Sequence, residues 1–312
     1  MNAEKLTDLI KEARPNIKES TIKMYVGNLM KLMKTFNEDN LNFLKDIDQV
    51  KEKLSEKHFT TQRNYYNSII IYLMAKKDKK IVEEYNDIRD ELNKKYVDDN
   101  SSGVISDKQK NNFVELSEIN KMIKDISNDL SIPKLKKKSS ISKKEENLLM
   151  VYVILNILIR IPLRNDLSNM ILLKKTQYNK LSNKQKEENN YLVMEKGKLN
   201  FILNDYKTSK KYKEKVLQIP KDLEKILRMY IKRMDFKVND IIFPLSRNGL
   251  SQLLIKTSKK YLNKSISTTM LRKIVASDLL SDVKKAEKEL SKKMGTDIDT
   301  IKNVYVKEMD QE

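Results

Sequence analysis

The sequence has no cysteine and only one histidine, His58. The lack of cysteine excludes disulfides, zinc–thiolate sites and thiol catalysis. A single histidine excludes a metal site built from several histidines. His58 is expected at the surface or at a helix end, away from any catalytic role.

Long hydrophobic runs are also missing. The longest one, Leu148 to Leu163, is interrupted by Asn156 and Arg160 and falls short of a membrane span. The first residues carry no apolar signal-peptide core. We therefore expect an intracellular protein without membrane contact, in the cytoplasm, the nucleus or a viral replication compartment, between which the sequence does not distinguish.

Negative charge is under-represented relative to positive charge. The chain carries 63 Lys and Arg against 44 Asp and Glu, a formal net charge of +19. This excess favours a polyanionic partner, most commonly nucleic acid. The abundance of Lys, Asn and Ile also fits an AT-rich genome, such as that of a virus, a mobile element or a low-GC microbe. A merely lysine-rich protein is the alternative explanation of the charge.

The 312 residues, 39% of them hydrophobic, suffice for one large or two ordinary domains. Hydrophobic residues recur at helical spacing through residues 1–100, in four or five segments without a strand signal. This pattern predicts a compact helical domain. Asp98 to Gly103 is polar, helix-breaking and contains one of only five glycines. We place a linker at residues 101–115 and a second domain at residues 116–312.

The second domain is predicted to mix helices with a small sheet. Leu148 to Ile159 is the most hydrophobic helix and the expected centre of the core. A further helix, with Asn165 or Asp166 as its cap, is expected to carry Leu167, Met170 and Ile171. The period then changes, and three short strands are predicted at Tyr191–Met194, Leu199–Leu203 and Lys215–Ile219. The predicted fold is mainly α, with an N-terminal helical domain and a C-terminal α+β domain around a three-stranded antiparallel sheet.

Four short motifs stand in order along this second domain. Pro162–Leu167 contains Arg164, and Tyr206–Thr208 contains Lys207 on a loop between two predicted strands. Thr269–Arg272 reads T-M-L-R and Met294–Thr296 reads M-G-T, with Tyr305 nine residues past Thr296. Each motif alone is a weak signal, whereas the ordered set is a stronger one.

The ordered set resembles the signature of the tyrosine recombinase (phage integrase) family. That family carries an H-x-L-R box, an L/M-G-H box and a tyrosine nine residues past the second histidine, with a first arginine and a hairpin lysine upstream. Thr269 and Thr296 stand here at the two histidine positions. The resemblance implies a site-specific DNA recombinase or integrase, with an N-terminal core-binding domain and a catalytic domain that act as a homotetramer on paired sites in double-stranded DNA.

The resemblance also implies a role for each residue. Tyr305 would attack a DNA phosphodiester and form a covalent 3′-phosphotyrosine. Arg164 and Arg272 would hold the non-bridging oxygens, for which the guanidinium fork is suited. Lys207 would protonate the departing 5′-oxygen. The reaction needs neither a metal nor a cofactor.

Several alternatives stay open at this point. Arg160 competes with Arg164, and Lys210 or Lys211 competes with Lys207. A threonine hydroxyl can donate a hydrogen bond but cannot take a proton near neutral pH, and such general acid–base help is typically worth ~10²- to 10⁴-fold. The other functional hypotheses are therefore a catalytically weakened or inactive DNA-binding relative, and an enzyme like a type IB topoisomerase or telomere resolvase. Taken singly, Tyr305 is also compatible with a core aromatic residue.

Overall fold

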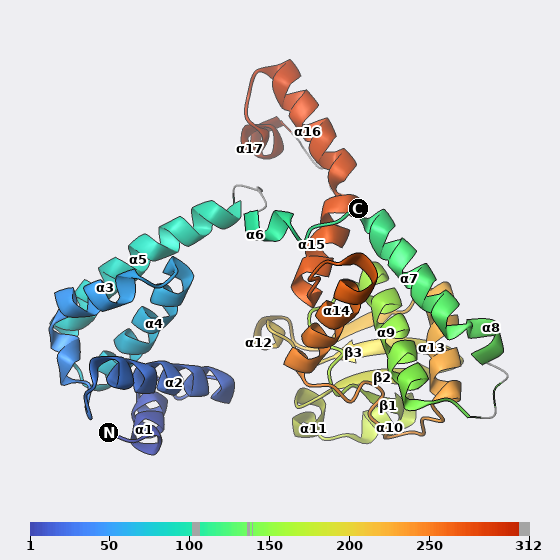
Figure 1. Cartoon of the computed structure of the whole chain (residues 1–312), viewed down its shortest axis with the longest axis horizontal. Helices are drawn as coiled ribbons and strands as arrows, with labels where there is room; N and C mark the ends of the chain where they lie inside the picture. The colour runs from blue at the N-terminus through green and yellow to red at the C-terminus, as the bar shows by residue number, and fades with distance from the viewer. Residues whose placement is uncertain (102–106, 136–137, 139, 306–312) are drawn as a thin grey trace. The chain divides into compact units, whose positions relative to one another are not determined.

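The computed structural model describes residues 1–101, 107–135, 138 and 140–305 (Figure 1). The chain divides into two compact units, Met1–Ile105 and Ser106–Glu312. Both units are largely helical, and the described residues of the second include one four-stranded sheet. The fold class is thus mainly α with a small sheet, as predicted. No helix within the described ranges is long and apolar enough to cross a membrane.

Unit 1 is a bundle of helices around α4. Its elements are α1 (Ala3–Ala13), α2 (Glu19–Phe36), the 3₁₀ turn η1 (Asn42–Lys45), α3 (Ile47–Ser55), α4 (Phe59–Ala75) and α5 (Lys79–Ser101). α4 packs against α1, α2, α3 and α5. Every side chain from Ser68 to Leu73 is buried. Burial of consecutive residues means that this part of α4 is covered on all its faces. His58 caps α4 by accepting a hydrogen bond from the Thr60 amide at 3.4 Å, which confirms its expected place at a helix end.

The junction between the units differs from the predicted linker. Asp98 to Ser101 form the last turn of α5 instead of breaking the helix, and residues 102–106 lie outside the described residues. Beyond α6 (Asp107–Lys110), the backbone is held to the body of unit 2. Lys264 Nζ donates to the Asn111 carbonyl at 2.9 Å, and the Ser265 amide donates to Asn112 Oδ1 at 2.6 Å. Part of the segment expected to be a linker is therefore fixed to unit 2.

The core of unit 2 is built around α9 (Lys143–Arg160), which confirms its predicted place at the centre of this core. α9 begins at a capping box, in which Ser142 and Glu145 satisfy each other's backbone amides. It ends just before Pro162, which disfavours helical backbone in the preceding residue. The helices that cover it are α7 (Leu116–Leu130), α13 (Lys221–Arg233), α14 (Arg247–Leu262) and α15 (Thr268–Leu279). α8 (Ile132–Leu135) follows α7 as a single turn.

The sheet has four strands in the order β1-β2-β3-β4. The three predicted strands are confirmed as β2 (Asn190–Glu195), β3 (Lys198–Leu203) and β4 (Lys215–Gln218), and they pair antiparallel. The additional strand β1 (Ile171–Lys174) pairs parallel with β2. α10 (Lys175–Lys180) and α11 (Asn183–Glu187) lie in the connection between these two strands.

The helix expected to carry Leu167, Met170 and Ile171 was wrong, because residues 166–169 form turns and Ile171 begins β1. A short apolar run such as Ile171–Leu173 does not by itself distinguish a strand from a buried helical turn. The strand is selected by distant partners. In addition to β2, the Leu172 amide donates to the Asp240 carbonyl at 3.0 Å and the Asn239 amide donates to the Leu172 carbonyl at 2.8 Å.

We call the last described elements the C-terminal arm: α16 (Ser281–Met294), α17 (Ile298–Thr300) and the π-helical turn η2 (Ile301–Tyr305). Gly295 ends α16 at a φ of 63°, a left-handed conformation that glycine adopts at little cost. Lys302 Nζ lies 2.7 Å from Glu287 Oε1 and ties η2 back to α16. Ile301 is buried, whereas several other apolar side chains of the arm are exposed, namely Val283, Leu290, Met294 and Val304.

Candidate active site

The two arginines expected to bind phosphate come together where α15 meets the turn that follows α9. Arg272 is partly buried, and its Nε donates to the Pro162 carbonyl at 2.7 Å, two residues before the exposed Arg164. The pKa of Arg272 is lowered, first by burial and then by the positive charge of Arg164. Two like charges this close favour a bound anion between them, so the pair has the charge arrangement of a phosphate site.

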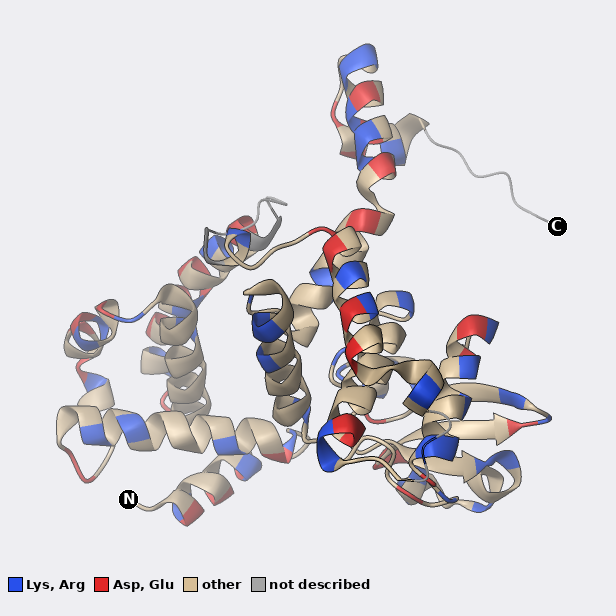
Figure 2. Ribbon diagram, turned by 45° about the vertical axis from the view of Figure 1, so that its right-hand side comes forward, with Lys and Arg blue, Asp and Glu red and all other residues tan. Residues whose placement is uncertain are grey.

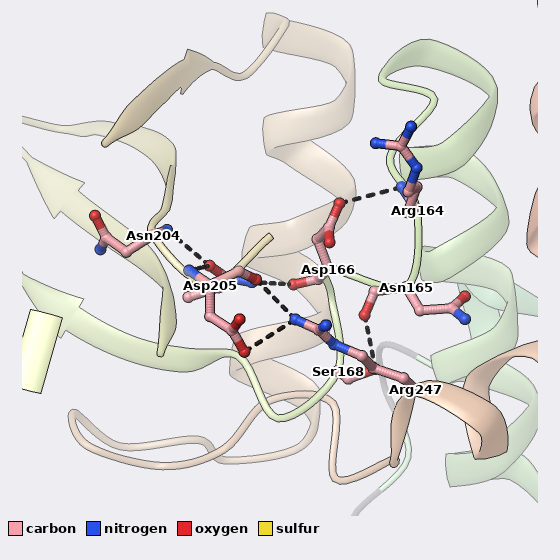
Figure 3. A network of polar contacts seen from close by, with 8 residues as sticks. Arg164, Asn165, Asp166, Ser168, Asn204, Asp205 and Arg247 are labelled. Carbon is pink, nitrogen blue, oxygen red and sulfur yellow. Dashed lines mark hydrogen bonds and ion pairs between the residues drawn. The ribbon is translucent and has the colours of Figure 1, made fainter. Parts of the chain in front are cut away.

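Asp166 is a buried acidic residue next to this pair of arginines, with 7% of its surface exposed. Its carboxylate accepts a hydrogen bond from the Arg164 amide at 3.2 Å (Figure 3). Burial raises the pKa of Asp166, against the opposing effects of that amide and of the charges of Arg247, Arg164 and Arg272. Asp166, which the sequence suggested only as a possible helix cap, is therefore a buried carboxyl near three arginines, and its hydrogen bond to them is the one from the Arg164 backbone amide.

Arg247 is the third arginine, and the sequence analysis did not identify it. It lies at the start of α14, where its Nη2 donates to the Asp205 carbonyl at 2.8 Å and lies 2.9 Å from Asp205 Oδ2. Figure 3 shows Asp166 with Arg164 on one side and Arg247 on the other. The only sequence signal was its position next to Ser246, the N-cap of α14. That signal is too common to single out a site residue.

Lys207 lies on the loop between β3 and the short helix α12 (Ser209–Tyr212), and it is exposed. Tyr206 closes this loop by donating from Oη to the Lys213 carbonyl at 2.8 Å. Asp205, two residues before Lys207, is the partner of Arg247. The base of the loop is thus attached to Arg247. Lys210 and Lys211 on α12 are exposed as well, so the choice among these lysines remains a prediction.

The remaining predicted residues lie on two elements. Thr269 is exposed in the first turn of α15, one turn before Arg272. Thr296 and Tyr305 belong to the C-terminal arm, and Tyr305 is 59% exposed, so it is not a core aromatic residue. Within the described part of the chain, no hydrogen bond or ion pair joins Tyr305 or Thr296 to the two arginines or Lys207. The structure brings the arginines together, and no contact that it shows among the described residues joins Tyr305 to them.

Arg160, the rival of Arg164, has a different environment. Its Nε donates to Asp222 Oδ2 at 2.7 Å, and its Nη1 donates to the carbonyl and the side-chain oxygen of Asn156 at 3.1 and 2.9 Å. These contacts link α9 to α13. The Arg160 guanidinium is therefore already engaged in contacts at the surface of the fold, which favours Arg164 as the phosphate-binding residue.

The raised pKa of Asp166 leads to a prediction about stability. A carboxyl whose pKa is higher in the folded than in the unfolded state destabilises the fold above its folded pKa, and this penalty disappears as the pH falls through that value toward the unfolded pKa of about 3.9. Asp166→Asn does not titrate. We expect the unfolding free energy of the wild type, relative to Asp166→Asn, to rise as the pH is lowered through this window. Thermal unfolding of both proteins from neutral pH to pH ~4 measures the difference, and a constant difference would contradict it.

Comparison with known proteins finds a similar structure but no similar sequence. No protein-family model matches the chain, and no curated protein matches it. Among solved structures, the chain is similar to a crystal structure of XerA recombinase, with 15% sequence identity and a TM-score of 0.35, over 89% of this chain and 85% of that chain. At this level of similarity, the chemistry assigned to the site rests on the chain's own residues.

Proposed function

We propose that the protein is a site-specific DNA strand transferase of the tyrosine recombinase type. The observation that carries the proposal is that Arg272 bonds to the Pro162 carbonyl, two residues before Arg164, whose own amide bonds to the buried Asp166. Paired guanidinium groups can each make charge-assisted hydrogen bonds to the non-bridging oxygens of a phosphodiester. They stabilise the negative charge that these oxygens gain in the transition state.

The proposed reaction begins with attack of Tyr305 Oη on the phosphorus. A bond forms between the phenol oxygen and phosphorus, and the bond from phosphorus to the 5′-oxygen breaks. Lys207 gives a proton to the departing 5′-oxygen, and the phenol proton passes to water. The resulting 3′-phosphotyrosine preserves the energy of the phosphodiester, so a 5′-hydroxyl can later attack it and rejoin the strands without ATP.

Two features of the chain affect the rate of this reaction. Tyr305 lies on the C-terminal arm, so the arm has to bring it to the phosphate held by the arginines. Thr269 and Thr296 can donate hydrogen bonds to phosphate oxygens but do not accept the phenol proton near neutral pH. A proton acceptor at such a position typically contributes ~10²- to 10⁴-fold, and the proposed enzyme is therefore slow.

The charge distribution supports a DNA substrate. Lys and Arg positions, blue on the ribbon, occur along helices of both units (Figure 2), and the net charge is +19. Contacts of such residues with phosphates position a duplex without reading its sequence. In the proposal, residues 1–100 bind the core of the DNA site, residues 116–312 carry out catalysis, and a homotetramer joins two paired sites.

A second function is favoured by a specific observation. The lack of a contact between Tyr305 and the arginines in the described residues, together with threonine at both histidine positions, fits a DNA-binding protein that has lost turnover. The two functions differ in one product, which is a covalent bond between the protein and DNA. A binding protein of this kind would retain salt-dependent affinity for duplex DNA without forming that bond.

A nicked suicide duplex, in which the cleaved end diffuses away, tests the proposal. The duplex carries a candidate attachment site taken from the DNA next to the gene. We expect a protein–DNA adduct that survives a denaturing gel. A duplex that is bound in a native gel but forms no adduct would support the binding protein instead. Relaxation of a supercoiled plasmid that lacks the site would favour a topoisomerase-like activity.

A further inference from the structure

Asn190, at the start of β2, is a buried polar residue with 4% of its surface exposed. Its Nδ2 donates to the Asp166 carbonyl at 2.8 Å and to the Asp205 carbonyl at 2.9 Å. Its Oδ1 accepts from the Asn204 amide at 2.8 Å and from the Asp205 amide at 2.9 Å. Both donors and both lone pairs of the side-chain amide are therefore used.

The position of Asn190 explains why an amide is needed there. Asn190 and Leu203 are the last register pair of the β2–β3 ladder at this end. The backbone groups of Asn204 and Asp205 continue beyond the ladder, and buried backbone groups require partners. The Asn190 side chain supplies those partners and also reaches the backbone of Asp166, which belongs to a different segment. It thus adds hydrogen bonds beyond the end of the β2–β3 ladder and also joins the ladder to the segment that contains Asp166.

The segments that Asn190 joins carry two of the proposed catalytic groups. Asp166 lies two residues after Arg164, and Asp205 lies two residues before Lys207. Neither segment is helical or part of a strand at these residues, so the ladder alone does not fix the distance between them. The Asn190 side chain is a direct hydrogen-bonded connection from the turn that carries Arg164 to the loop that carries Lys207.

Other contacts hold the Lys207 loop without providing this connection. Tyr178 Oη forms a short hydrogen bond with Glu214 at the far end of the loop and accepts from Asn204 Nδ2 at 3.3 Å. Arg247 holds Asp205. These contacts hold the loop, but none of them is a hydrogen bond to the backbone of the turn that contains Arg164 and Asp166. Loss of Asn190 would therefore shift the loop relative to the turn before it unfolds the loop.

We propose that Asn190 is a positioning residue that holds Lys207 against the leaving oxygen of the phosphate bound by Arg164. This role rests on the proposed strand-transfer function. Arg164 and Lys207 have to act on one phosphate at the same moment, and a displacement of about 1 Å can cost on the order of 10²-fold in rate. Asn190 does not touch the substrate, because all its hydrogen-bonding capacity is used by the backbone.

Asn190→Asp is the sharpest variant. It has nearly the same shape and keeps two oxygens that can accept from the Asn204 and Asp205 amides. It replaces the donating group that faces the carbonyls of Asp166 and Asp205, so it removes the link to the Arg164 turn. Asn200→Asp on β3 makes the same chemical change outside the cluster and serves as the matched control. Asn190→Ser, which is uncharged, checks that the added charge is not the cause.

The test compares single-turnover cleavage of two suicide duplexes, one with the ordinary 5′-oxygen and one with sulfur in its place. A thiolate leaves without a proton because the pKa of a thiol is about 8.5, so the sulfur duplex does not need Lys207. We expect Asn190→Asp and Asn190→Ser to slow cleavage of the oxygen duplex by on the order of 10²-fold, with most of this loss recovered on the sulfur duplex. Asn200→Asp should match the wild type on both.

The ratio of the two rates separates positioning from loss of structure. Partial unfolding lowers the amount of active protein and slows both duplexes equally, so an unchanged ratio would overturn the positioning role. Variants that cleave the oxygen duplex as fast as the wild type would overturn it as well. If the wild type itself cleaves neither duplex, the proposed function fails, and this role of Asn190 fails with it.

Discussion

Tyr305→Phe should form no covalent complex with DNA while still binding the duplex. Phenylalanine lacks only the hydroxyl oxygen, so the nucleophile is lost with little change in shape. Loss of a catalytic nucleophile removes the covalent route, and we expect the rate of adduct formation to fall by roughly 10⁴-fold or more. The measurement is the amount of adduct on a denaturing gel, followed by peptide mapping of the wild-type adduct.

Tyr212→Phe provides the matched control for this experiment. Tyr212 is 61% exposed against 59% for Tyr305, and it lies on α12, in the connection that carries Lys207. It is the tyrosine most easily mistaken for the nucleophile on grounds of position. The adduct should persist in Tyr212→Phe. An adduct that disappears in Tyr212→Phe and persists in Tyr305→Phe would reassign the nucleophile to α12.

Alanine at Arg164 or at Arg272 should each lower the rate of strand cleavage by roughly 10²- to 10³-fold, as expected for removal of one donor to a developing negative charge. Binding of the duplex should change much less, because many other basic residues contribute to it. The effects should be less than additive in the double variant, since the two guanidinium groups act on one phosphate. Single-turnover cleavage and native-gel binding, measured on the same preparations, check both statements.

Arg160→Ala is the control for the two arginines. Its guanidinium links Asn156 on α9 to Asp222 on α13 at the surface, so its replacement should affect thermal stability more than the cleavage step. Arg160 also competes with Arg164 for the role of first arginine in the sequence. A cleavage rate that falls more in Arg160→Ala than in Arg164→Ala, at equal folded content, would contradict the assignment of Arg164.

The elements predicted correctly are those with a local signal in the sequence. The long apolar stripe of α9 and the alternating segments of β2, β3 and β4 each fix their own conformation. β1 was missed because Ile171–Leu173 becomes a strand only through pairing with β2 and with Asn239 and Asp240. The end of α5 was placed too early because polar residues such as Asp98 and Asn100 have low helix propensity, yet the helix continues through Ser101.

The candidate site shows the same division. Arg164 and Arg272 stood in short motifs, and the structure brings these two together. The burial of Asp166 and the contacts of Arg247 and Asn190 depend on segments far apart in the chain, and no spacing rule reveals them. The catalytic roles of Tyr305, Lys207, Thr269 and Thr296 remain predictions, which the experiments above address.

The construction of the C-terminal arm has a consequence for how the protein opens. α16 packs against its sequence neighbours α15 and α17, and much of its apolar surface is exposed. Segments with few buried contacts open with free energies well below that of global unfolding. The backbone amides of α16 should therefore exchange their hydrogens with solvent sooner than those of α9. The proposed nucleophile is carried by one of the most easily opened parts of the fold, and its capture by DNA would be visible as slower exchange along the whole arm.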